Sequence, residues 1–253
     1  MFPILVLIGF AAGTLGSMIG VGGGIIIVPF LTFFGMQPAQ IASTSLFAVT
    51  STSVSSSIEY SRQKRIDYKL AISMAAAALP GTVLGAVLSH SISLESFRLY
   101  FAILLAIAGL YVLYKTRILR EPQTKSPTFS TKLAVVALSF VAGVISSLFG
   151  VGGGIIFVPA MLLLLGIAMQ RAAPTSQMIL LITSIGGLVA HIALGHPDYV
   201  SGILLAAGAV IGGQVGARLS KRVRDYYLQA ALGIVLIGVS AKLIYDWMVQ
   251  SRL

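Results

Sequence analysis

Two glycine runs of the same sequence offer the most specific chemistry in this chain. Both read Gly-Val-Gly-Gly-Gly-Ile-Ile, and they begin at Gly20 and at Gly150. A helix that restarts after such a run has backbone amides without partners inside the helix, and its dipole places partial positive charge there. Such helix ends bind anions. The residues expected to contribute are Gly22, Gly23, Gly24 and Ile25 in the first run, and Gly152, Gly153, Gly154 and Ile155 in the second.

Hydroxyl and amide side chains follow each glycine run. They are Thr44 and Ser45 after the first run, and Thr175, Ser176 and Gln177 after the second. Their polar groups can donate hydrogen bonds to an oxyanion. They can equally cap a helix or bond back to the preceding turn, as Ser and Thr often do, and the sequence leaves both interpretations open. Because Leu46 stands opposite Gln177, the two sides of a shared site would differ.

Four further polar residues are candidates for gating or proton relay. Gln214 lies inside an apolar stretch, and polar groups at membrane depth usually face the interior of the bundle. Glu59, His191 and Arg218 lie toward the ends of predicted spans. A structural hydrogen bond for Gln214, and ordinary solvation at the membrane surface for the other three, are the simpler interpretations.

The motifs that would indicate an enzyme or a pump are missing from this sequence. It has no P-loop, no HExxH and no glycine-rich dinucleotide turn after a strand. It also has no cysteine and only three histidines. We therefore predict that the chain is not an enzyme, has no catalytic residue, and uses neither a cofactor nor a metal.

The elements that hold these residues must be membrane helices. Of 253 residues, 57% are hydrophobic and 9% are charged, whereas soluble domains carry about 25% charged residues. About eight apolar segments can each supply the roughly 20 residues that a span requires. The formal charge of +10 lies in short loops between spans, where it indicates topology and not a nucleic-acid partner. We predict an all-α, polytopic protein whose surroundings are the lipid bilayer.

The glycine runs belong to a repeat that covers most of the chain. Residues 10–29 align with residues 140–159 without a gap at an offset of 130, and beyond this stretch the offset becomes 131. Such self-similarity indicates a duplicated structural unit. We expect a first transmembrane repeat at 1–115, a polar linker at 116–131 and a second transmembrane repeat at 132–253.

Each repeat opens with a long apolar segment that its glycines interrupt. These segments cover about 3–34 and 133–166, and glycine disfavours a helix by roughly 1 kcal/mol per residue. A discontinuous helix or a re-entrant hairpin should result. Three ordinary helices follow in each repeat, at about 41–60, 70–90 and 96–115 and at about 172–194, 199–219 and 227–249. The stretch 43–57 has ten Ser or Thr in fifteen positions, so one side of that helix should face protein or water.

Basic residues alternate between the equivalent loops of the two repeats. The loop at 62–69 carries Arg62, Lys64, Arg65 and Lys69, and its counterpart at 196–198 carries no Lys or Arg. The next loop, at 90–95, carries none, and its counterpart carries Arg218, Lys221, Arg222 and Arg224. Under the positive-inside rule the two repeats would lie inverted in the membrane. Both termini would then be external.

The doubled motif resembles a known family. Two copies of Gly-Val-Gly-Gly-Gly-Ile-Ile-x-Val-Pro, each followed about 15 residues later by Thr-Ser, are similar to those of the sulfite exporter TauE/SafE family. The resemblance covers nearly the whole chain. It implies secondary transport of small anionic sulfur compounds, such as sulfite or organosulfonates, across a cytoplasmic membrane, and it does not fix the substrate.

Our hypothesis from the sequence is a multi-pass transporter of the cell membrane. A small anion would be held between the two glycine breaks, and the repeats would rock about it in alternating access. The alternative is a channel-like or non-transporting membrane scaffold, in which the glycines only allow close packing of helices. Oligomeric state, direction of transport and coupling to protons are open at this point.

Overall fold

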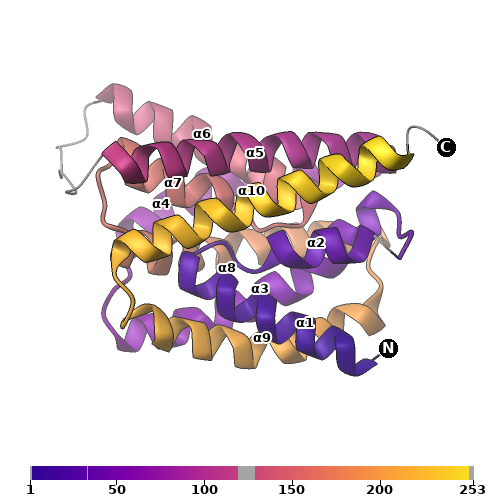
Figure 1. Cartoon of the computed structure of the whole chain (residues 1–253), viewed down its shortest axis with the longest axis horizontal. Helices are drawn as coiled ribbons and strands as arrows, with labels where there is room; N and C mark the ends of the chain where they lie inside the picture. Colours follow the sequence, from indigo (N-terminus) through magenta and orange to yellow (C-terminus); the bar gives the residue numbers. More distant parts are fainter. Residues whose placement is uncertain (1, 33, 119–128, 251–253) are drawn as a thin grey trace.

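The computed structural model describes residues 2–32, 34–118 and 129–250, and these form a bundle of helices (Figure 1). The first half of the chain contributes α1 Phe2–Ile19, α2 Gly24–Thr32, α3 Pro38–Arg62, α4 Tyr68–Ser89 and α5 Leu94–Ile118. The second half contributes α6 Phe129–Phe149, α7 Gly154–Leu164, α8 Met169–Ala193, α9 Tyr199–Ser220 and α10 Asp225–Gln250. The all-α prediction is confirmed.

Both long apolar segments are broken at the glycine runs, as the sequence predicts. The first becomes α1 and α2, and the second becomes α6 and α7. Figure 1 shows α2 running back toward the end of the bundle at which α1 begins. The segment is thus a hairpin of one long and one short helix.

Six of the described helices are long and apolar enough to cross a membrane. They are α1, α4, α5 over 94–114, α8, α9 and α10 over 226–248. Two shorter apolar stretches cover 133–149 in α6 and 154–164 in α7. The sequence estimate of about eight apolar segments counted 41–60 as an ordinary span. That stretch lies in α3, which is long but rich in Ser and Thr and packs most of its hydroxyl groups inside the protein.

Helices extend into both ends of the segment 116–131 that the sequence predicts as a polar linker. Helix α5 continues to Ile118, and α6 already begins at Phe129. The rest of the predicted linker, 119–128, lies outside the described residues.

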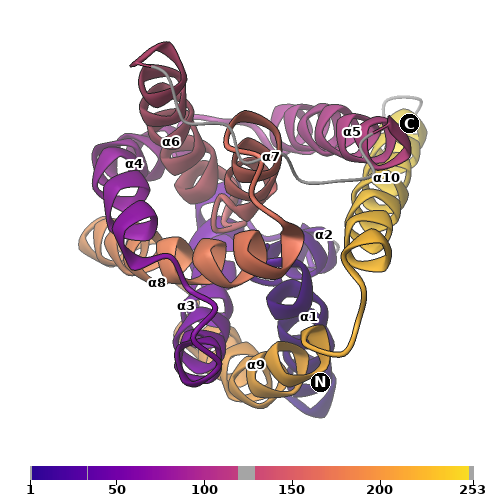
Figure 2. The same cartoon turned by 90° about the vertical axis from the view of Figure 1, so that its left-hand side faces the viewer.

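Glycines allow the helices of one half to pack closely on those of the other. Helix α1 packs along α9, and α4 packs along α6. A Cβ atom at Gly9 would collide with the Leu205 carbonyl of α9, and one at Gly143 would collide with the Ala78 carbonyl of α4. Such contacts are the usual basis of helix association in membranes. Helices α5 and α10 pair with each other at the edge of the bundle (Figure 2).

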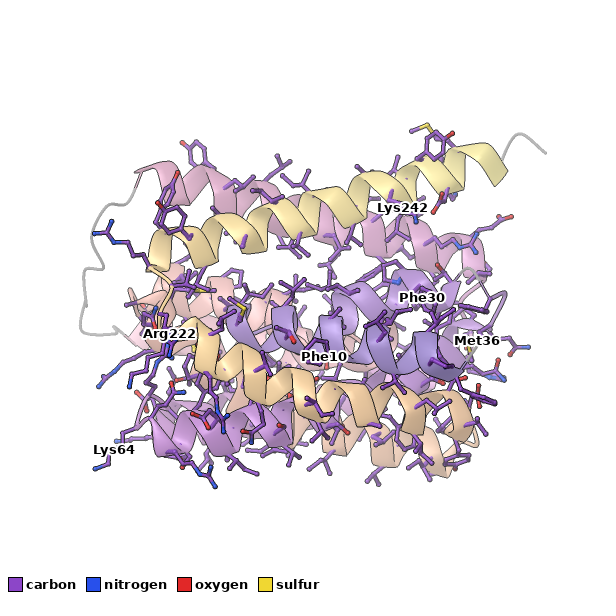
Figure 3. All side chains as sticks on the ribbon, turned by 60° about the horizontal axis from the view of Figure 1, so that its bottom comes forward. Phe10, Phe30, Met36, Lys64, Arg222 and Lys242 are labelled. Atoms are coloured by element: carbon purple, nitrogen blue, oxygen red, sulfur yellow. The ribbon has the colours of Figure 1, made fainter. Side chains whose placement is uncertain are left out.

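The two ends of the bundle differ in charge. We call one the basic end, because the loops at 62–69 and 221–224 both lie there, with Lys64 and Arg222 on the same side in Figure 3. The Arg65 Nη1 atom donates to Ser220 Oγ at 3.1 Å, which joins the first loop to the end of α9, directly before the second loop. The opposite end holds His90, His191 and His196, and we call it the histidine end. Helix α1 begins and α10 ends at the histidine end (Figure 1).

This arrangement predicts the labelling of introduced cysteines, because the natural chain has none. Arg62→Cys and Arg222→Cys should both react with a membrane-impermeant maleimide from one side of the membrane. Ser91→Cys, in the loop after α4 at the histidine end, should react from the other side. The measurement is single-cysteine labelling in intact cells and in inverted vesicles. Labelling of positions 62 and 222 from opposite sides would contradict the fold.

Candidate functional site

The breaks depend on a backbone conformation that only glycine adopts easily. Gly22 and Gly23 have φ angles of 81° and 84°, and Gly152 and Gly153 have φ angles of 86° and 78°. Residues with a Cβ atom rarely occupy this left-handed region. The consecutive glycines therefore serve to reverse the chain, which spaced packing glycines would not require.

The two breaks touch each other at the middle of the bundle. A Cβ atom at Gly24 would lie 2.6 Å from the Val151 Cα atom, and one at Gly154 would lie 2.6 Å from the Val21 Cα atom. The main chain of each run thus packs directly on the main chain of the other. Runs that are 130 residues apart in sequence form one buried centre.

Apolar side chains complete this centre. Val49 from α3 and Leu180 from α8 both lie next to Gly22, where a Cβ atom would be 3.0 Å from each. The same two side chains approach Gly152, at 2.6 Å for Val49 Cγ1 and 2.9 Å for Leu180 Cδ2. The contact leaves no room for a larger residue at either glycine.

Backbone amides at the start of both short helices are unbonded. The amides of Gly24, Ile25, Gly154 and Ile155 donate no hydrogen bond to any described residue. The first bonds of the short helices come from the next residues, at 3.1 Å from Ile26 N to Gly23 O and at 2.9 Å from Ile156 N to Gly153 O. Buried donors without partners cost about 1–3 kcal/mol each. A bound anion would satisfy them.

Ser176 and Gln177 hold the first break in place. Ser176 Oγ donates to the Gly20 carbonyl at 2.7 Å, and Gln177 Nε2 donates to the Gly16 carbonyl at 2.9 Å. The side-chain oxygen of Gln177 accepts two hydrogen bonds at 3.1 Å, from Ser53 and Ser56 of α3. The polar groups beside the first break are thus paired within the protein.

The second break lacks this support. At the offset of the repeat, Leu46 replaces Gln177, while Ser146 and Ser184 stand where the first half has Gly16 and Ser53. The hydroxyls of Ser146 and Ser184 are buried and have no partner in the described part of the chain. The hydroxyls of Ser45 and Ser147 are likewise buried and have no described hydrogen-bond partner. Ser146 lies against the break, with its Cβ atom 3.2 Å from a Cβ atom built at Gly153.

Sequence reasoning did not identify Ser146, Ser147 and Ser184 as candidates. The signal was present in the aligned repeats, because Ser146 faces a glycine and Leu46 faces a glutamine. These pairs show that the halves differ in polarity next to the breaks.

The two threonines predicted as ligands have partners inside the protein. Thr44 Oγ1 accepts from the Asp198 amide at 3.2 Å, and Thr175 Oγ1 accepts from the Asp67 amide at 3.1 Å. Each aspartate caps the start of a helix, α9 or α4. These bonds favour the structural interpretation of the threonines; contact of either threonine with a solute stays a prediction.

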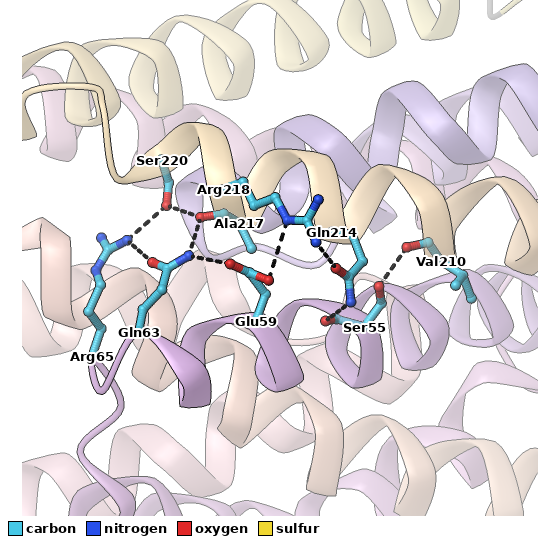
Figure 4. A network of polar contacts seen from close by, with 9 residues as sticks. All are labelled: Ser55, Glu59, Gln63, Arg65, Val210, Gln214, Ala217, Arg218 and Ser220. Atoms are coloured by element: carbon cyan, nitrogen blue, oxygen red, sulfur yellow. Dashed lines mark hydrogen bonds and ion pairs between the residues drawn. The ribbon is translucent and has the colours of Figure 1, made fainter.

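Glu59, Gln214 and Arg218 form one polar chain between α3 and α9 (Figure 4). Arg218 Nε lies 3.4 Å from Glu59 Oε2, Arg218 Nη2 donates to Gln214 Oε1 at 3.4 Å, and Gln214 Nε2 donates to the Ser55 carbonyl at 3.4 Å. The Arg218 side chain is 65% exposed, and exposed ion pairs contribute little to stability. The structure does not bring these residues next to the glycine breaks by any contact that it describes.

A second set of contacts joins several elements at the basic end. Arg65 donates from Nε to the Gln170 carbonyl at 2.9 Å, and its Nη2 atom also contacts the Gln170 side chain. The buried Tyr60 hydroxyl donates to the Ser17 carbonyl at 2.8 Å and bonds Ser220 Oγ at 3.0 Å. Arg65 and Ser220 are bonded as well (Figure 4). These contacts tie the loop after α3 to α1, α8 and α9.

His191 lies at the opposite end and bonds the Ser147 carbonyl at 2.9 Å through Nε2. Within the described ranges, no group of three or more His, Asp or Glu side chains is placed to hold a metal ion. A cavity of about 320 Å³ lies at the histidine end, between the loops at 35–39 and 89–94.

Comparison with known proteins identifies the family. Residues 5–243 match the family model of sulfite exporter TauE/SafE. The chain belongs to this family. It is 33% identical to the Bacillus subtilis "Probable membrane transporter protein YunE" over 97% of this chain and 98% of that protein. It is 28% identical to YfcA of Escherichia coli K12, over 96% and 89% of the two chains.

A further TauE/SafE relative comes from an archaeon. The "Probable membrane transporter protein MJ0441" of Methanocaldococcus jannaschii is 26% identical over 93% of this chain and 92% of its own length. No solved structure matches the chain. These relatives are named as transporters and not as enzymes, so this TauE/SafE member is a multi-pass membrane protein with six candidate spans in its described part.

Gln177→Leu is expected to destabilise the protein, because it removes the bond to Gly16 and leaves the Ser53 and Ser56 hydroxyls buried without their acceptor. We expect a loss of about 2–4 kcal/mol in the free energy of unfolding. The matched control is Gln214→Leu, whose bonds are longer and partly exposed, with a loss of less than about 1 kcal/mol. Unfolding by SDS, followed by circular dichroism, measures both. Equal losses would contradict the role of Gln177.

Proposed function

We propose that the chain is a secondary transporter that moves a small anion across the cytoplasmic membrane. The solute class is a sulfur oxyanion or organosulfonate, such as sulfite, held between the two glycine breaks. The observation that carries this proposal is the set of unbonded amides at Gly24, Ile25, Gly154 and Ile155, all buried at the contact between the runs. Membership of the TauE/SafE sulfite exporter family supports the solute class.

The second break is the stronger half of the proposed site. This break packs against Ser146 at Gly153, and the buried Ser146 hydroxyl has no described partner. Ser184 offers a second unpartnered hydroxyl in the same half. Hydroxyl and amide donors together suit an oxyanion, because each oxygen of the anion can accept several hydrogen bonds. The first break is already paired through Gln177 and would serve mainly to support the second.

The contacts at both ends of the bundle support alternating access. Tyr60 and Arg65 close the basic end, and His191 contacts α6 at the histidine end. The glycine runs between them are buried. We infer that a solute reaches the buried glycine runs only when one end opens. Transporters built from broken helices at the bilayer midplane work in this way.

We further infer that the two halves are inverted repeats and that both termini are external. The support is the contact of the basic loops at one end of the bundle, together with the positive-inside rule. The amide of Asp67 bonds Thr175, and the amide of Asp198 bonds Thr44. These reciprocal bonds are what a two-fold relation between the halves requires.

Uptake of radiolabelled sulfite into proteoliposomes tests the function. We expect saturable uptake that unlabelled sulfite competes. Ser146→Ala should raise the concentration for half-maximal uptake by about tenfold, because a hydrogen bond to a charged group is worth about 1.5–3 kcal/mol. It should not destabilise the protein, since the hydroxyl has no partner to lose.

Ser139→Ala is the matched control on the same helix. Among the described residues, the Ser139 hydroxyl bonds the Val135 carbonyl of α6, so uptake should keep its half-saturating concentration. Unchanged half-saturation in Ser146→Ala would refute the proposed site. Uptake that does not saturate would indicate a channel, and no uptake of any anion by folded protein would contradict the proposed solute class.

A further inference from the structure

All three histidines of the chain meet at the histidine end, although they come from different elements. His191 lies in the last turn of α8, His196 lies in the loop before α9, and His90 caps the end of α4. The Nδ1 atoms of His191 and His196 are 2.9 Å apart. The rings of His90 and His196 stack in parallel with their centroids 5.7 Å apart.

The contacts of His191 fix where the protons lie. Its Nε2 atom is 2.9 Å from the Ser147 carbonyl, which can only accept, so Nε2 carries a proton. In the neutral ring Nδ1 is then the acceptor, and the proton in the 2.9 Å contact belongs to His196 Nδ1. The pair is therefore a directed chain, from His196 through His191 to the backbone of α6.

This chain has little capacity for additional protons. One proton can bind His196 at its free Nε2 atom, beside the stacked His90 ring. A second proton would have to bind His191 at Nδ1, where it would face the N–H of His196 at 2.9 Å. Two donors cannot share that distance, so the contact must then break.

No carboxylate is described in contact with the three histidine rings. The ion pair of Arg218 with Glu59 lies in the last turns of α9 and α3, toward the basic end and away from the histidines. The Asp198 carboxylate accepts from Ser201 at 2.6 Å and caps α9, and Glu95 at the start of α5 is exposed.

Burial lowers the pKa of His196, and the nearby charge of His90 lowers it further. Because the pKa of His196 is lowered in the closed form, proton uptake favours the open form, and the closed form loses stability as the pH falls. Arg98, the cation buried nearby in α5, donates to the Thr32 carbonyl at 2.8 Å. No contact that the structure describes joins Arg98 to the histidines.

Protons can reach the cluster from solution. His90 is exposed and lines the cavity of about 320 Å³ at this end, together with Ser89 and Ser93. Through the stacked rings, His90 connects this cavity to His196.

We propose that His90, His191 and His196 form a proton-binding site that holds the histidine end closed while it is neutral and releases it on proton uptake. The ligand is the proton itself. The inference rests on the proposed function in one respect, because alternating access requires the histidine end to open. Its consequence is a coupling of proton concentration on one side of the membrane to access of the anion.

The equivalent positions at the basic end carry residues of a different kind, and this difference supports a specific role for the histidines. At the offset of 131, Tyr60 corresponds to His191 and Arg65 to His196. Tyr60 bonds the Ser17 carbonyl and His191 bonds the Ser147 carbonyl, which are equivalent positions in α1 and α6. A guanidinium stays charged at any physiological pH, whereas an imidazole titrates there. Equivalent contacts are thus insensitive to pH at one end and sensitive at the other.

Cysteine labelling tests this without any solute. Ser147→Cys places a thiol beside the carbonyl that His191 covers, and Ser91→Cys provides an exposed reference at the same end. In nanodiscs, the ratio of their labelling rates by a maleimide removes the effect of pH on thiol reactivity. We expect this ratio to rise about tenfold between about pH 7.5 and about pH 5. A flat ratio in the parent protein would overturn the proposal.

Two variants distinguish the effect of the His191–His196 pair from that of His90. The double variant His191→Gln with His196→Gln removes both titrating rings. Whatever the value of the labelling ratio in this variant, the ratio should no longer depend on pH. His90→Gln keeps the pair and removes the neighbouring charge, so the pH midpoint should move upward. A pH response retained in the double variant would overturn the proposal. Because no anion is present, failure of sulfite uptake would not affect the result.

Discussion

The structure depends on the cost of breaking a helix inside a membrane. Backbone N–H groups in the hydrocarbon region cannot form hydrogen bonds with water. Every interrupted helix therefore needs hydrogen-bond partners from within the protein. Here two helices are interrupted at the same depth, at Gly20–Gly23 and Gly150–Gly153, and the breaks pack on each other. The serine-rich α3, the bonds of Gln177 and the close glycine contacts between halves all serve to bury or satisfy these two breaks.

The two breaks differ in the hydrogen-bond partners that surround them. Beside the first break, Gln177 links Gly16 to Ser53 and Ser56, and no hydroxyl of these serines is left without a partner. Beside the second, Leu46 takes the equivalent place and Ser146 stays unpaired. An oxyanion would supply an acceptor for the Ser146 hydroxyl beside the second break. This asymmetry gives a physical reason for a single bound solute in a chain made of two similar halves.

The sequence predicts the helices and the breaks well because both follow from local patterns. Consecutive glycines stop a helix wherever they stand, and the short helices begin at Gly24 and Gly154, within the predicted amide runs. The contacts that shut the ends could not be predicted. Tyr60 with Ser17, and His191 with Ser147, join residues 43 and 44 positions apart, and only the packed fold selects them. Helix α3 was taken for an ordinary span because its length suffices, but most of its serines and threonines are buried in protein.

Crystals grown with selenite test the central claim most directly, because selenite has the shape and charge of sulfite and its selenium scatters anomalously. The account predicts an anomalous peak between the breaks, within hydrogen-bonding distance of the Gly154 and Ile155 amides and of the Ser146 hydroxyl. A peak only at the basic end, or only in the cavity at the histidine end, would contradict it.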